Sequence, residues 1–86
     1  MRKIIECLDA QGLDSLLGEQ VLLLCSAYFY TGKLTGVNDT CVELENPAIV
    51  YETGAWTDKG YKDAQKLHTT KFFVQRASIE SFGVSK

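Results

Sequence analysis

The spacing of apolar residues along the chain changes character at Gly18. Before it, three leucines stand at the i, i+3 and i+4 positions of a helix: Leu13, Leu16 and Leu17. Asp9 or Asp14 can cap the start of such a helix, and Gly18 is a residue type that commonly follows the end of one. We therefore predict a short helix over residues 9–17, within the N-terminal segment 1–18.

After Gly18 the pattern is that of β-strands. Residues 20–30 are almost continuously apolar, which predicts one strand buried on both faces along much of its length. Residues 32–37 alternate between polar and apolar side chains, as a strand with one solvated face does. Asn38 and Asp39 follow, and both residue types favour a tight turn because their side chains bond to the nearby backbone.

A third strand is interrupted near its middle. Residues 40–45 alternate cleanly, Asn46 and Pro47 break the alternation, and an extended run resumes at residues 49–52. A single bent or bulged strand explains this pattern better than two independent strands.

Residues 53–70 are the one irregular segment of the sequence. Within it, the spacing of Tyr61, Ala64 and Leu67 predicts a single helical turn. Trp56 either covers the open end of a barrel, which we prefer, or presents an exposed stacking surface.

Two strands complete the pattern, at residues 69–76 and 78–82, with a very tight connection between them. The chain of 86 residues therefore predicts a single domain that is mainly β. A short helix followed by about five short antiparallel strands favours a closed or nearly closed, strongly bent barrel.

The composition is that of an ordinary globular protein: 45% hydrophobic, 10% aromatic and 23% charged. Cys7, Cys25 and Cys41 are odd in number and widely spaced, so we expect neither a disulfide framework nor a zinc site. Free thiols suit the cytoplasm. Glu6 and Asp9 leave the N-terminus without the apolar run of a signal peptide, and no apolar run is long enough to span a membrane.

The net charge of −2 argues against bulk electrostatic binding of nucleic acid. The charges are unevenly distributed, however. Residues 59–86 hold six basic and two acidic side chains, whereas residues 1–58 hold three basic and nine acidic ones. The C-terminal part can therefore supply a basic face.

No motif in the sequence predicts catalysis. The chain has no nucleophile elbow, phosphate loop or metal-ligand spacing, and His68, the single histidine, has no partner near it in sequence. We expect a protein that is not an enzyme and that uses no metal or cofactor.

The stretch YTGKLTGVNDTCVELEN, residues 30–46, resembles the first motif of the Sm/LSm family, which includes bacterial Hfq. Glycines and apolar positions carry this resemblance: Gly32, Leu34, Gly36 and Cys41. The string FVQRASI, residues 73–79, is loosely similar to the second motif. A longer string, VELENPAIVYETGAW, is similar to small Sm-like proteins of tailed phages.

The resemblance covers roughly residues 13–82 and implies an Sm-like fold, in which a short helix precedes a five-stranded SH3-like barrel. It divides the domain 1–86 into four parts: an N-terminal helical segment (1–18), a first motif region (19–52), an insertion (53–70) and a second motif region (71–82).

The residues with which Sm proteins contact a base are not kept. The Asn that grips the base falls at Val42, and the residue on which the base stacks falls at Thr40. Asn38 stands where the family has Asp, and the Arg-Gly pair of the second motif is displaced or absent. An alternative register places Asp39 at the Asp position and Glu43 at the Asn position, which suits RNA no better.

The resemblance implies a homo-oligomeric ring of about five to seven subunits, in which an edge strand of one copy pairs with the last strand of the next. The candidate interface consists of apolar residues in these strands: Phe72, Phe73, Val74, Ile79 and Phe82. The alternative is that the same residues fill the core of one monomer.

The resemblance also places a candidate RNA-binding site in the loops that would line the pore: Asn38, Asp39, Thr40, Arg76 and Ser78. Arg76 would hold a phosphate, and Asn38 or Asp39 would read a base edge or a ribose hydroxyl. Turn chemistry alone also explains Asn38 and Asp39.

The aromatic run at residues 28–30 allows two interpretations. It forms a stacking platform for single-stranded nucleic acid, or it packs in the core and against neighbouring strands, which we prefer.

We therefore expect a non-catalytic Sm-like ring protein that binds single-stranded RNA as a chaperone or regulator. The alternative is a ring-shaped scaffold of the same fold that binds other proteins through residues 53–70 and has no role with RNA.

Overall fold

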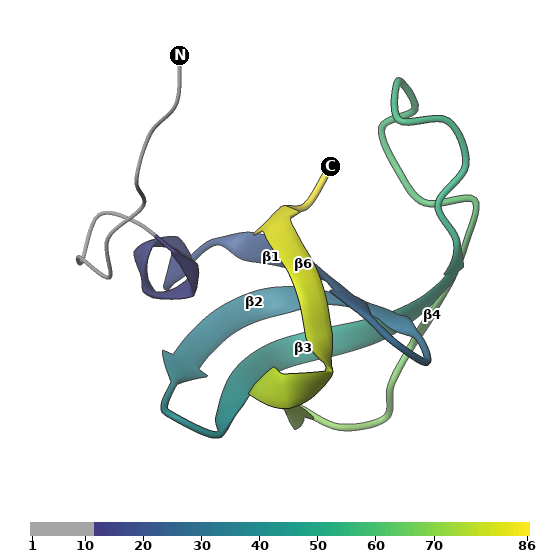
Figure 1. Cartoon of the computed structure of the whole chain (residues 1–86). Coiled ribbons are helices and arrows are strands. Elements are labelled where there is room, and N and C mark those ends of the chain that lie inside the picture. Colours follow the sequence, from purple (N-terminus) through teal and green to yellow (C-terminus); the bar gives the residue numbers. More distant parts are fainter. Residues whose placement is uncertain (1–11) are drawn as a thin grey trace, which may run out of the picture.

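The computed structural model describes residues 12–86, which form a mainly β structure (Figure 1). Six strands make one antiparallel sheet, and the helical elements of these residues are two short 3-10 turns. In chain order the elements are η1 (Leu13–Leu16), β1 (Gln20–Cys25), β2 (Phe29–Val37), β3 (Cys41–Glu52), β4 (Asp63–Lys66), β5 (Lys71–Gln75), η2 (Arg76–Ser78) and β6 (Ile79–Val84).

Strand β3 organises the sheet because three other strands pair with it. The strand order is β4-β3-β2-β1-β6, and β5 also pairs with β3. The first part of β3, from Cys41 to Glu45, carries β5, whereas the second part, from Ala48 to Glu52, carries β4. The predicted bent third strand is thereby confirmed.

The bend in β3 lies at Asn46 and Pro47. Asn46 has a φ of 51°, a left-handed conformation that Asn tolerates better than most residues. Its main-chain N–H donates to the carbonyl of Thr70 at 3.1 Å, just before β5 begins. The side chain of Pro47 is fully buried. The bend therefore directs β3 away from β5 and toward β4.

Gly32 of β2 lies against the inside of this bend. A Cβ atom at Gly32 would stand 3.2 Å from the Cβ of Leu44 and 3.3 Å from the Cα of Pro47. The absence of a side chain at Gly32 thus lets β2 approach the bent strand closely, as glycine does where two backbones meet.

The core lies on one face of the sheet. Its buried members come from η1 and from four strands: Leu13, Val21, Leu23, Cys25, Leu34, Val42, Leu44 and Val74. Residues of alternate register on the opposite face are also buried, among them Leu22, Thr31 and Ala48. The predicted burial of both faces is therefore confirmed for β1.

Several sequence-based boundaries are wrong. The run 20–30 is not one strand, because Cys25 donates its N–H to the carbonyl of Tyr28 at 3.2 Å and a tight turn separates β1 from β2. This turn contains none of the Gly, Pro, Asn or Asp residues that usually indicate one. Within residues 53–70, β4 replaces the predicted helical turn, because the second half of β3 offers its edge for pairing. The sheet consequently has six strands, not five.

The predicted N-terminal helix is replaced, in its described part, by the 3-10 turn Leu13–Leu16. Gly12 precedes this turn with a φ of 78°, so the helical backbone begins only at Leu13. The rest of the predicted helix, residues 9–11, lies outside the described residues.

The prediction of a closed barrel is also wrong. Strands β5 and β6 are joined by η2, as the tight connection predicted, but they lie at different edges of one sheet and do not pair with each other. The ladder to β3 fixes β5, and the ladder to β1 fixes β6. In residues 12–86, no helix is long and apolar enough to cross a membrane.

The replacement Gly32→Ala tests the close approach to the bend. We expect it to lower the free energy of unfolding by about 1–3 kcal/mol, because the added methyl group meets backbone and Cβ atoms that cannot move freely. Urea unfolding followed by circular dichroism measures this loss. The control is Gly83→Ala in β6, where a Cβ has no atom within 4 Å. Equal losses in the two variants would contradict the role of Gly32.

Candidate functional site

The side chain of Asn38 builds the turn between β2 and β3. Its Oδ1 accepts hydrogen bonds from the main-chain N–H groups of Thr40 and Cys41, both at 2.8 Å, and from Thr40 Oγ1 at 3.1 Å. The main-chain N–H of Asn38 donates to the carbonyl of Cys41 at 3.0 Å. The predicted turn is confirmed, and the side-chain oxygen of Asn38 is used within it.

Arg76, which is distant from this turn in the sequence, binds to it in the structure. Its Nη1 donates to the carbonyl of Asn38 at 2.8 Å, and its main-chain N–H donates to the carbonyl of Thr40 at 2.9 Å. The structure thus brings together Asn38, Thr40 and Arg76, three of the five residues predicted as an RNA-binding site. We call this group the Arg76 turn site.

The other two predicted residues are placed differently. Asp39 lies exposed at the tip of the turn, and among the described residues its carboxylate has no hydrogen bond or ion pair. Ser78 lines a separate pocket beside β5. Val42, where the resemblance would require a base-gripping Asn, is completely buried in the core.

Strand β5 presents an open edge. Arg76 donates to Thr40 and Asn46 donates to Thr70, so these are hydrogen-bonded positions of the β3–β5 ladder. Because such positions alternate along an antiparallel ladder, the main-chain groups of Phe73 and Gln75 are directed away from β3. They are available to pair with another strand.

Strand β6 presents the second open edge. Ser85 donates its N–H to the carbonyl of Gln20 at 2.7 Å, which fixes the alternation of the β1–β6 ladder. By the same rule, the main-chain groups of Phe82 and Val84 are directed away from β1. Both side chains are also substantially exposed, at 43% and 61%.

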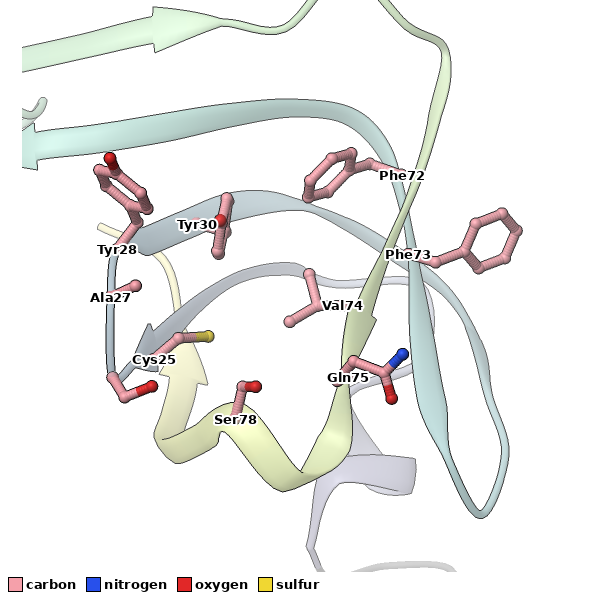
Figure 2. A pocket seen from close by; sticks show the side chains of 10 residues that line it. Cys25, Ala27, Tyr28, Tyr30, Phe72, Phe73, Val74, Gln75 and Ser78 are labelled. Atoms are coloured by element: carbon pink, nitrogen blue, oxygen red, sulfur yellow. The ribbon is translucent and has the colours of Figure 1, made fainter.

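The five predicted interface residues divide between core and surface. Val74 is buried, and Phe72 and Ile79 are half-buried against the core. Phe73 and Phe82 are exposed. Phe72 and Phe73 point to opposite sides of β5 (Figure 2). Val74, Phe72 and Ile79 therefore fit the interpretation as core residues. Only Phe73 and Phe82 are exposed enough to contact another subunit.

An aromatic pocket that sequence reasoning missed lies between the β1–β2 turn and β5 (Figure 2). Its volume is about 220 Å³. Tyr30 and Phe72 pack together in it with ring centroids 5.4 Å apart, and Tyr28 stands edge-on to Tyr30 at 6.5 Å. Cys25 also lines it, and burial, with a smaller contribution from Glu80, raises the pKa of the thiol above its ordinary value. The aromatic run 28–30 was the one signal in the sequence, but the pocket itself could not be predicted, because its lining comes from strands far apart in the chain.

A second hollow lies on the other side of the β1–β2 turn. It has a volume of about 300 Å³, and its aromatic walls are Tyr28, Phe29 and Tyr51. The rings of Tyr28 and Tyr51 meet nearly at right angles, at 88°. Of the predicted platform 28–30, Tyr28 and Phe29 are therefore on the surface, whereas Tyr30 packs against the core.

The described residues hold no group of three or more His, Cys, Asp or Glu side chains placed to bind a metal ion. Comparison of the sequence with protein-family models and with curated proteins finds no match to either.

Replacement of Asn38 tests how far the Arg76 turn site depends on the side-chain amide. We expect Asn38→Ala to lower the free energy of unfolding by about 1–2 kcal/mol, since it removes the acceptor of three hydrogen bonds. Thermal or urea unfolding measures the change. The control is the adjacent Asp39→Ala, which removes no hydrogen bond and should change stability little. A loss in Asp39→Ala as large as in Asn38→Ala would contradict this assignment.

Proposed function

We propose that this chain is a subunit of a homo-oligomeric, Sm-like ring that binds single-stranded RNA and catalyses no reaction. The observation that carries the proposal is the arrangement of β5 and β6. These two strands are linked by three residues, Arg76–Ser78, yet each lies at an open edge of the same sheet. Pairing of β5 in one copy with β6 in the next is a head-to-tail contact, and head-to-tail contacts close into rings.

The apolar surface supports assembly. Exposed large apolar side chains lie on both edge strands, Phe73 on β5 and Phe82 and Val84 on β6. Open edges with apolar side chains pair readily with other chains unless they are covered. A domain of this size also gains stability from oligomerisation.

The Arg76 turn site supports RNA as the ligand. It lies where β5 runs into η2, next to the proposed subunit contact, so a ring would repeat it in every subunit around one axis. Among residues 12–86 the guanidinium makes one hydrogen bond, from Nη1 to Asn38, so its other donors can bind a phosphate oxygen. Repetition would turn a weak contact into a strong one through effective concentration. Repulsion from Asp39 opposes this binding, and because the attraction between Arg76 and a phosphate is screened by salt, the net binding should weaken as salt rises.

A protein-binding scaffold of the same ring is the second candidate. Two observations favour it: Val42 is buried where a base-contacting Asn would be needed, and Trp56 in the insertion is 62% exposed. Exposed aromatic side chains of this kind are common at protein interfaces.

The ring is tested at Gln75, whose main-chain N–H is directed away from β3. Its φ of −65° and ψ of 127° already suit proline, so Gln75→Pro leaves the subunit fold intact and removes the N–H donor from the edge. We expect the native protein to be oligomeric by light scattering at micromolar concentration, and Gln75→Pro to be largely dissociated. The matched control Gln75→Ala keeps the N–H and should remain oligomeric. A monomeric native protein would exclude the ring.

RNA binding is tested by fluorescence anisotropy with labelled U-rich and A-rich oligonucleotides. We expect binding at low salt that weakens as salt rises. Arg76→Ala should weaken it by about tenfold or more, since a charged donor is lost, whereas Lys59→Ala, an exposed lysine of the insertion, should change it little. Circular dichroism checks that Arg76→Ala is folded. Absence of binding at low salt, or an unchanged affinity in Arg76→Ala, would leave the scaffold as the better proposal.

A further inference from the structure

The insertion folds against the residues that follow β6, and Lys86 is the centre of this contact. The ammonium Nζ of Lys86 donates to the carbonyl of Thr53 at 2.6 Å and to the carbonyl of Ala55 at 2.8 Å. It also lies 5.2 Å from the ring centroid of Trp56 and 5.1 Å from that of Tyr61. Four groups of one loop thus converge on a single cation.

These four groups are the ones that suit an alkylammonium ion. An ammonium has three N–H donors and no acceptor, so two carbonyl oxygens satisfy two of them directly. Aromatic faces within about 6 Å attract the positive charge through their quadrupole. Within residues 12–86, the ion pairs involve Lys62 and Lys71 and not Lys86. Lys86 is therefore held by carbonyl dipoles and aromatic rings and not by a carboxylate.

Turns of the loop backbone that do not involve Lys86 set the shape of the loop. Gly54, between the two carbonyl-bearing residues, has a φ of 71°, and a Cβ there would stand 3.2 Å from the Cβ of Lys62. Asp58 donates its N–H to the carbonyl of Ala55 at 3.0 Å, which closes the turn around Trp56. The acceptors are thus fixed by backbone turns.

Ser85 positions the cation donor from the other side. Its hydroxyl lies 2.6 Å from the Tyr61 hydroxyl and 3.2 Å from Oγ1 of the buried Thr31. Its main chain is bonded to Gln20 of β1. Lys86 therefore extends from a residue that is anchored to the sheet, and Tyr61 is held by that same residue.

We propose that Trp56, Tyr61 and the carbonyls of Thr53 and Ala55 form a binding site for a primary alkylammonium ion, which Lys86 occupies within the same chain. Lys86 thereby fixes the insertion against the end of β6. Removal of its side chain frees the site for a free alkylammonium ion. The site involves neither the open edges nor the Arg76 turn site, so it stands independently of the proposed function.

Trp56 is the only tryptophan of the chain, so its fluorescence reports on this site. The full chain carrying Lys86→Ala is titrated with n-butylammonium chloride, and potassium chloride at equal ionic strength serves as the salt control. We expect Lys86→Ala to shift the Trp56 emission, and butylammonium to reverse the shift saturably in the millimolar range. Tetramethylammonium, which has no N–H donor for the carbonyls, should bind more weakly.

Two proteins provide matched controls. The native chain, whose site is filled by Lys86, and Lys59→Ala, which removes a lysine of the same insertion, should show no saturable response to butylammonium. An unshifted emission in Lys86→Ala, or a reversal equally produced by potassium chloride, would overturn the proposal. So would an equal response in the native chain. Light scattering and RNA binding are also measured on Lys86→Ala. These two measurements test the proposed ring and its RNA binding, whereas the Trp56 emission tests the alkylammonium site, so failure of one proposal can be told from failure of the other.

Discussion

The bend of β3 is the constraint on which the rest of the structure depends. A straight strand pairs with one neighbour at each edge, but β3 changes direction at Asn46 and Pro47 and offers one edge to both β5 and β4. The bend is possible because Asn46 adopts a left-handed conformation and because Gly32 of β2 has no side chain at the point where β2 packs against the bend. The same strand, β3, holds β5 in place, so Arg76, which directly follows β5 as the first residue of η2, reaches the β2–β3 turn.

The sheet stays open, with β5 and β6 at separate edges. Each of these two strands therefore keeps a row of main-chain donors and acceptors that no other strand of residues 12–86 satisfies. The aromatic pocket lies between one of these two strands, β5, and the β1–β2 turn. The open edges and the exposed Phe73 and Phe82 thus have one physical origin, an incompletely closed sheet in a small domain.

The candidate site was predictable where chemistry is local and unpredictable where it is not. Asn38 could be identified because Asn in a turn bonds to the backbone two or three residues ahead, and it does so here. The contact between Arg76 and Asn38 was not predicted, because the two residues are distant in sequence; the family resemblance only named both as candidate RNA-binding residues. The contacts of Lys86 with the insertion had no sequence signal at all, because lone lysines and aromatics occur on many solvated surfaces.

By itself, the sequence determined the mainly β class, the alternation of residues 40–45, the interruption of β3 and the β2–β3 turn. Alternation of side chains and turn chemistry are properties of a few adjacent residues, so they can be read without a fold. Only the tertiary structure decided that residues 63–66 form a strand, that the sheet stays open and that Trp56 lies beside Lys86. Each of these depends on a partner distant in the chain, because an edge strand forms only where another strand offers its edge, and a cation is held only where separate loops meet.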